Sequence, residues 1–377
     1  MRKNIIYEYC EVEDTELKEY IINTPSLQKY FQLSWSVLKT RQYCGILNFN
    51  NQDIYLLPKI ADSDEKNLDI FIYMLMYAYD IQLQNEDIAS CKNETHNILE
   101  VFMQLFAQGL IGEFKRGVYK EYITEQENLR TLRGKYLINE NLKYNHIKNK
   151  IYCEYDEFSQ NNTLNQFFLY AIKTLLKYSK NKKLLKQCEL ALDGVEQRVF
   201  NIHNLEIHFN RLNQRYRDSF EFALLLLQKS IPLFSQDKKS FAFLFDMNEL
   251  FENFIARMIK ENYKNVTIPK KNKVFGELYL KPDIIKDDMI IDCKYKKISS
   301  SDIAKREDRY QMYVYANNYE MKSTMLLYPK YKDTINKTVF LGENDKKVEL
   351  KMRSIDLDFD GGYDEFLDTI KRRLEMI

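Results

Sequence analysis

Glycine and proline are scarce in this chain. Only 10 glycines and 6 prolines occur among 377 residues. Long flexible linkers, collagen-like repeats and disordered segments are rich in these residues, so their scarcity argues against all three. With 45% hydrophobic and 29% charged residues, the chain has the composition of an ordinary globular protein with room for two or three domains.

Other common signatures are missing too. The six cysteines are scattered without a C-x-x-C pair and the four histidines lack metal-ligand spacing, which argues against zinc and favours reduced thiols in the cytoplasm. No signal peptide and no run of about 20 apolar residues occurs, so no membrane contact is expected. The chain has no G-x-x-x-x-G-K-[ST] motif for nucleotide hydrolysis. Its net charge of +1 means that any nucleic-acid contact must be local.

The most informative stretch is 278–297, LYLKPDIIKDDMIIDCKYKK. Two apolar runs, LYLKPDIIK and MIIDCKYK, flank Asp287-Asp288, which predicts a β-hairpin with a two-residue turn. Counting outward from that turn places Asp283 opposite Asp292. Directly opposed residues have Cβ atoms roughly 4.5–5.5 Å apart, where two carboxylates repel each other. A divalent cation between them would reverse the sign of this interaction.

A lysine completes this pattern. Lys294 lies on the same face as Asp292, because side chains alternate along a strand. Pro282-Asp283 followed by Asp292-Cys293-Lys294 resembles the PD-(D/E)xK motif of nucleases. The motif alone is weak, and an exposed hairpin with ordinary surface charges is the alternative.

Helical patterns flank the hairpin. Apolar residues within 247–258 recur at helical spacing, and Glu252 lies at the margin of this stripe. Downstream, 309–316 is a second helical run, in which Gln311 and Tyr315 are four residues apart on one face. An acidic helix, the hairpin and a Q-x-x-x-Y helix follow one another in this order in RecB-like nucleases.

The rest of the chain predicts a mixed α/β (α+β) fold in three parts. We expect a mixed β domain over 1–70, a helical region over 71–235 and the nuclease-like domain over 236–377. The polar stretch 230–240 marks the last boundary. Within the middle region, the basic and glycine-punctuated segment 116–137 predicts a protruding finger, with a solvated loop as the alternative.

Several individual elements are also predicted. A strand over 4–12 precedes a helix over 14–22, which Asp14 or Thr15 caps. An apolar helix is expected over 69–83. Further helices are expected over 165–192, whose lysines form a solvated or DNA-facing side, within 194–217 and over 363–375.

Several short motifs, taken in order, resemble the McrC family, the nuclease subunit of modification-dependent restriction systems. They are M-L-M-Y-A-Y at 74–79, R-G at 116–117, L-R-G-K at 132–135, Y-D-E at 155–157, T-L-N at 163–165, L-F-E-N-F at 250–254, the two aspartates and the lysine of the hairpin, and Tyr310-Gln311. Longer family members also share the G-I-L and I-x-L-x-P-K-I pattern that this chain carries within 45–60.

The resemblance implies a division of labour. The C-terminal PD-(D/E)xK restriction-endonuclease-like domain would cut double-stranded, modified DNA. The N-terminal region would dock, through a finger, into the channel of a ring of McrB-like AAA+ GTPase subunits. Arg116, Arg130 or Arg133 would contact those subunits, because a guanidinium makes bidentate contacts and keeps its charge when desolvated.

We expect the hairpin to bind Mg²⁺ or Mn²⁺, which prefer hard carboxylate oxygens. Asp283 and Asp292 would be ligands, and the backbone carbonyl of Cys293 would be a further one. Glu252 would lie in the outer shell or on a second ion.

Lys294 would orient or deprotonate the attacking water, or stabilise charge in the transition state. Gln311, with Tyr315 behind it, would position the phosphate or the lysine. Candidate DNA contacts are Tyr295, Lys296, Lys297 and Tyr315. Two other functions stay open: a catalytically inactive regulator of an NTPase ring, and a free-standing RecB-like nuclease.

Overall fold

The computed structural model describes residues 4–35, 37–50, 52–81, 98–146, 149–202, 204–235, 238–299 and 304–376. Two compact units make up the chain: the first combines Met1–Asn97 with Pro232–Ile377, and the second is Ile98–Ile231. None of the described helices is both long enough and apolar enough to span a membrane. The described cysteines are free thiols.

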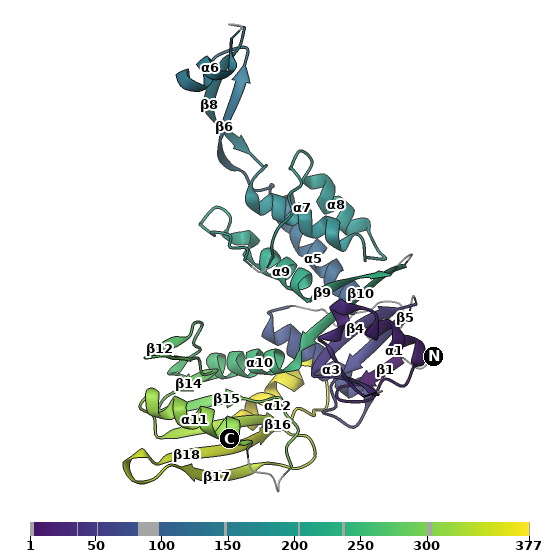
Figure 1. Cartoon of the computed structure of the whole chain (residues 1–377), viewed down its shortest axis with the longest axis vertical. Helices are drawn as coiled ribbons and strands as arrows, with labels where there is room; N and C mark the ends of the chain where they lie inside the picture. The colour runs from purple at the N-terminus through teal and green to yellow at the C-terminus, as the bar shows by residue number, and fades with distance from the viewer. Residues whose placement is uncertain are drawn as a thin grey trace. The chain divides into compact units, whose positions relative to one another are not determined.

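The first unit contains a five-stranded sheet in the order β1-β5-β4-β10-β9 (Figure 1). Its strands are β1 (Asn4–Tyr7), β4 (Tyr43–Phe49), β5 (Gln52–Leu57), β9 (Ser230–Ser235) and β10 (Lys238–Asp246). Strand β4 pairs antiparallel with both β5 and β10, so the start of the chain lies beside its C-terminal half. This long-range pairing is why the structure divides the chain differently from the sequence, which placed boundaries after residues 70 and 235.

Gly45 allows β4 and β10 to approach closely. Its φ is +144°, and a Cβ at this position would lie 2.0 Å from the carbonyl oxygen of Phe243. Only glycine fits such a conformation and such a distance. The G-I-L motif is therefore explained by packing of the sheet.

Helices α1 and α3 of this unit begin at side-chain caps. Helix α1 (Thr15–Ile22) follows Asp14, whose carboxylate accepts a hydrogen bond from the backbone N–H of Leu17 at 2.9 Å, which confirms the predicted cap. Helix α3 (Asp64–Ala78) follows its cap Ser63 and so begins before the predicted start at residue 69. Helix α2 (Pro25–Gln28) and a hairpin of β2 (Phe31–Ser34) and β3 (Val37–Thr40) complete the N-terminal part.

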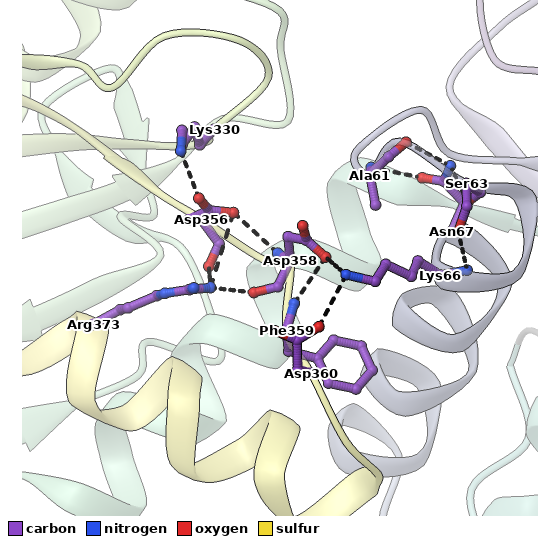
Figure 2. A network of polar contacts seen from close by, with 10 residues as sticks. All are labelled: Ala61, Ser63, Lys66, Asn67, Lys330, Asp356, Asp358, Phe359, Asp360 and Arg373. Carbon is purple, nitrogen blue, oxygen red and sulfur yellow. Dashed lines mark hydrogen bonds and ion pairs between the residues drawn. The ribbon is translucent and has the colours of Figure 1, made fainter.

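A polar network joins α3 to the acidic loop that follows residue 355 (Figure 2). Lys66 Nζ lies 3.1 Å from Asp358 Oδ1 and 3.2 Å from Asp360 Oδ1. The third aspartate of the loop, Asp356, lies within ion-pair distance of Lys330 and Arg373. Because lysine and arginine side chains already form ion pairs with these carboxylates, we interpret the acidic loop as a structural contact.

The second sheet of this unit has the order β11-β14-β15-β16-β18-β17. Its strands are β11 (Val266–Thr267), β14 (Ile284–Lys286), β15 (Met289–Cys293), β16 (Ser323–Pro329), β17 (Asn336–Leu341) and β18 (Val348–Ile355). The central strands β15, β16 and β18 run parallel. Ligand sites of open α/β sheets lie at the carboxyl ends of such strands.

Helices cover both faces of this sheet. Helix α11 (Arg306–Asn318) contributes Met312 and Ala316 to a core beside Ile290 and Leu326. Helices α10 (Met247–Asn262) and α12 (Tyr363–Glu375) pack against β15 and β18, respectively. The helix predicted over 363–375 is confirmed.

The second unit consists of helices and an arm. The helices are α5 (Ile98–Lys115), α7 (Thr163–Leu175), α8 (Lys183–Ala191), the short 3₁₀ helix η1 (Gln214–Tyr216) and α9 (Arg217–Lys229). The prediction of one helix over 165–192 is wrong. The buried carboxylate of Glu100 accepts hydrogen bonds from the backbone N–H groups of Lys180 and Asn181, at 2.8 and 3.0 Å, and holds the loop between α7 and α8. The prediction that 194–217 holds a helix is met only by η1, because the described residues before η1 are irregular.

The arm is a three-stranded sheet in the order β6-β8-β7. It comprises β6 (Glu121–Leu129), β7 (Lys135–Tyr136), α6 (Ile138–Tyr144) and β8 (Ile151–Ser159). Figure 1 shows it extending away from the helices of the same unit. A finger is therefore present, although its long second strand lies beyond the predicted range 116–137.

Candidate functional site

The predicted hairpin is formed by β14 and β15. Its register is confirmed: Ile284 pairs with Ile291, and Ile285 pairs with Ile290. The turn residue Asp287 has a φ of 49°, and its side chain accepts a hydrogen bond from Asn265 Nδ2 at 3.0 Å. This contact with the residue before β11 helps to hold a turn that its own Asp-Asp sequence favours only weakly.

The first arm of the hairpin is shorter than predicted. Leu278–Leu280 forms β13, which pairs with β12 (Lys273–Phe275) in a separate two-stranded sheet. Pro282 interrupts the run because it has no N–H to donate to a ladder. Asp283 consequently lies just outside the strand, and its Oδ2 accepts a hydrogen bond from the backbone N–H of Cys293 at 2.7 Å.

The two aspartates lie in a setting that disfavours their charges. Burial raises the pKa of Asp283 to about 8, and repulsion from Asp292 and Glu252 adds to the effect. Burial also raises the pKa of Asp292, although the nearby Lys294 opposes this shift. The site therefore holds carboxylates that a bound cation would stabilise.

Lys294 belongs to a chain of polar contacts. Its Nζ lies 2.6 Å from Asp292 Oδ2 and donates to Gln311 Oε1 at 3.0 Å. Gln311 Nε2 in turn donates to the hydroxyl of Tyr315 at 2.9 Å, and that hydroxyl donates to the carbonyl of Lys281 at 2.9 Å. The Q-x-x-x-Y pair of α11 thus holds the Lys294 side chain in position.

The charge state of Lys294 follows from these contacts. Burial alone would lower its pKa, but the ion pair with Asp292 and the charge of Asp283 raise the pKa above its ordinary value. In the metal-free site Lys294 is therefore an ammonium near neutral pH. In this state it can orient a water molecule or stabilise negative charge, and it cannot accept a proton.

Glu252 of α10 faces the same cluster. Burial raises its pKa; Lys281 and Lys294 oppose the shift, and the charge of Asp292 adds to it. Helix α10 packs against β15, and the Glu252 carboxylate interacts electrostatically with Asp292 and Lys294. The structure thus brings together the five residues predicted to be catalytic, from α10, the hairpin and α11.

The donor chemistry of this cluster suits a hard divalent cation, because its oxygen atoms belong to carboxylates. In the described part of the chain, however, no three histidine, cysteine, aspartate or glutamate side chains are arranged as a complete metal site. The Asp283–Asp292 pair would thus supply part of the ligand set. Cys293 contacts Asp283 through its N–H, and a ligand role for its carbonyl stays a prediction.

The predicted DNA contacts have different outcomes. Tyr295 is 3% exposed and donates its hydroxyl to Glu8, and Tyr315 is buried beside Gln311, so burial contradicts both predictions. Lys296 forms an ion pair with Asp308 at 2.9 Å. Lys297 is exposed, which leaves it as a predicted contact.

The three predicted partner-binding arginines lie in different parts of the second unit. Arg116 follows α5 directly and pairs with Glu113 at 3.3 Å, so it lies at the base of the arm. Arg130 is exposed at the end of β6. Arg133 is exposed, with its guanidinium 3.8 Å from the centre of the Tyr155 ring. Their role in partner binding stays a prediction.

Sequence reasoning missed Glu8, which is 2% exposed in the first unit. Its Oε1 accepts hydrogen bonds from the Tyr295 hydroxyl at 3.0 Å and from the Lys59 backbone N–H at 3.1 Å. Tyr295 also packs its ring against Phe251, next to Glu252. A glutamate that follows a short strand gives no sequence signal for such a role.

The model of the McrBC 5-methylcytosine restriction system component family matches residues 38–329. The chain is similar to a structure of the refined half-complex from the tetradecameric assembly of Thermococcus gammatolerans McrB AAA+ hexamers with bound McrC. The TM-score is 0.63 and the identity 24%, and the match covers 100% of each chain. It is also similar to the cryo-EM structure of the Thermococcus gammatolerans McrBC complex, with a TM-score of 0.50 and 27% identity over 69% of this chain and 88% of that chain. No curated protein matches the sequence. Because the family model spans most of the chain, this protein belongs to the McrBC 5-methylcytosine restriction system component family.

Proposed function

We propose that this chain is the Mg²⁺-dependent DNA endonuclease subunit of a modification-dependent restriction complex. The observation that carries the proposal is the buried cluster of Asp283, Asp292, Lys294 and Gln311. Its two raised carboxylate pKa values and its clamped ammonium have no evident structural benefit. Perturbed groups that converge from separate elements are typical of catalytic sites.

Each residue of the cluster has a separate task. Asp283 and Asp292 would hold the metal, which polarises a phosphate and lowers the pKa of a bound water. Lys294, fixed as an ammonium, would stabilise the negative charge that develops on the phosphate. Gln311 and Tyr315 keep the lysine in place, and Glu252 would bind outer-shell water.

The test is cleavage of duplex DNA by the full chain together with its partner, in Mg²⁺. Asp292→Ala and Lys294→Ala should each lower the rate by at least about 10³-fold, since each removes a group on which the chemical step depends. Asp288→Ala removes a carboxylate from the exposed turn of the same hairpin and should cut at the wild-type rate. Cleavage by Asp292→Ala at the wild-type rate would overturn the site and favour an inactive regulator.

We infer that the partner is a ring of AAA+ GTPase subunits and that the arm binds it. The family membership and the likeness to McrBC assemblies support this inference. Helix α6 buries none of its residues and exposes Ile138 and Leu142, which are 60% and 71% exposed. Apolar side chains exposed together are typical of an interaction surface. Partner binding would cover them.

A further inference from the structure

Two pairs of parallel strands end at one small cavity in the first unit. Strands β1 and β5 run parallel and end at Tyr7 and Leu57, and β15 and β16 run parallel and end at Cys293 and Pro329. Residues that follow all four strands line the cavity. Carboxyl ends of parallel strands are a common location of ligand sites, and here two such edges meet.

The buried carboxylate of Glu8 connects the segments that follow β5 and β15. One of its oxygen atoms accepts hydrogen bonds from the backbone N–H of Lys59 and from the hydroxyl of Tyr295. The loop after β5 and the segment after β15 are therefore attached to the same buried carboxylate. This attachment fixes the backbone positions from which the side chains of Lys59 and Lys297 extend.

Among the lysines that line this cavity, Lys59 and Lys297 form no ion pair with a carboxylate of the described residues. Two other lysines at its rim, Lys296 and Lys330, are paired with Asp308 and Asp356. Within the described residues, no carboxylate lies within ion-pair distance of Lys59 or Lys297, and both side chains are exposed. Glu8 lies buried beneath, where its carboxylate interacts with the charge of Lys297, so the exposed charges at the rim are those of Lys59 and Lys297.

Aromatic rings hold the second lysine in place. Lys297 Nζ lies 5.6 Å from the centre of the Tyr9 ring and 4.6 Å from that of Tyr331. Tyr9 has a φ of 58°, a left-handed conformation that costs a non-glycine residue about 1 kcal/mol or more. Such strain clusters at functional sites. The rings restrict the lysine without cancelling its charge.

The cavity lies close to the proposed catalytic lysine. Lys297 lies three positions after Lys294, so their Cα atoms are at most about 11 Å apart. Successive phosphates of one DNA strand advance about 3.4 Å along the helix axis. With the reach of the two side chains added, a phosphate at the cavity would lie within a few nucleotides of the scissile one.

We propose that Lys59 and Lys297 together bind one backbone phosphate of DNA that flanks the scissile phosphate. The N-terminal region would then hold substrate directly, which gives a function to its P-K-I segment. The inference rests on the proposed nuclease function, but binding can be measured without cleavage.

The experiment measures binding of a fluorescein-labelled DNA duplex to the full chain without divalent metal, over a range of salt concentrations. Each neutralised phosphate contributes about 0.9 to the slope of the logarithm of affinity against the logarithm of salt. The double variant Lys59→Gln, Lys297→Gln should therefore lower the slope by about 0.9 and weaken binding several-fold at low salt. Lys347→Gln is the matched control, because Lys347 is also exposed over a ring, 4.2 Å from the centre of Phe340, but lies outside this cavity.

The outcomes separate this subsite from the nuclease proposal. A wild-type slope in the double variant, or an equal loss in Lys347→Gln, refutes the subsite. A fall of about 1.8 refutes the sharing of one phosphate. If Asp292→Ala cuts DNA at the wild-type rate while the double variant loses the predicted slope, the catalytic assignment fails and the phosphate subsite stands.

Discussion

Asp283→Asn tests the electrostatic account of the site directly. Burial, Asp292 and Glu252 together raise the pKa of Asp283 to about 8. Asparagine has nearly the same shape, and its side-chain oxygen can still accept the hydrogen bond from Cys293 N that Asp283 accepts at 2.7 Å. The substitution therefore removes the ionisable group while it keeps the packing.

The sign of the effect follows from proton binding. The ordinary pKa of an aspartate is 3.8, so between about pH 4 and about pH 8 the folded chain keeps a proton that the unfolded chain has released. The free energy of unfolding then falls by about 1.4 kcal/mol for each pH unit. From about pH 5 to about pH 7, Asp283 should lower the stability of the metal-free protein by roughly 3 kcal/mol.

Urea unfolding of the wild type and of Asp283→Asn in EDTA, at a series of pH values, measures this contribution of Asp283 to stability. The stability of Asp283→Asn relative to wild type should grow by about 1.4 kcal/mol per pH unit across that window. Asp288→Asn, on the exposed turn, should follow the wild type. Added Mg²⁺ should stabilise the wild type more as the pH rises, because the metal competes with the proton. If the difference in the free energy of unfolding between Asp283→Asn and wild type did not change with pH, the idea that burial and repulsion disfavour the ionised carboxylates would be refuted.

Two further predictions concern the contacts that hold Lys294 and the arm. Tyr315→Phe removes the hydroxyl that joins Gln311 to the Lys281 carbonyl. We expect kcat to fall about tenfold, with KM nearly unchanged, in a steady-state cleavage assay. A wild-type kcat would show that Gln311 needs no such support. Arg130→Ala combined with Arg133→Ala should weaken binding to the AAA+ partner by about 2 kcal/mol or more in calorimetry. Arg116→Ala, at the base of the arm, is the control with the smaller expected loss, and the reverse order would exclude the end of the arm as the contact.

The sequence predicted the local geometry of the site well. The hairpin register depends only on a turn and an apolar pattern within one short stretch, so counting from Asp287-Asp288 gave the pairing that the structure has. Helical spacing likewise put Gln311 and Tyr315 on one face of α11, where they form a hydrogen bond. The extent of the first hairpin arm was wrong because the apolar pattern outweighed the missing N–H of Pro282.

Contacts between distant segments could not be predicted in the same way. Glu8 and Tyr295 are separated by 287 positions, and nothing in either local pattern indicates that they form a hydrogen bond. Tyr295 therefore looked like a DNA contact, since it stands between lysines, whereas its ring and hydroxyl are used to join two sheets. The pairing of β4 with β10 is equally non-local, which is why residues 1–70 looked like a separate domain.

The charge of the site also bears on which cation it would hold. With all groups ionised, Asp283, Asp292 and Glu252 contribute three negative charges and Lys294 contributes one positive charge, which leaves a net charge of −2 in a largely buried cluster. In the metal-free protein this excess is relieved by protonation, as the raised pKa of Asp283 indicates. A monovalent ion would leave one charge unbalanced, whereas a divalent ion would balance the cluster and release the proton. The same balance would let Lys294 stay an ammonium beside a metal. Its charge would be offset by Asp292, and the lysine and the ion could then both face a phosphate.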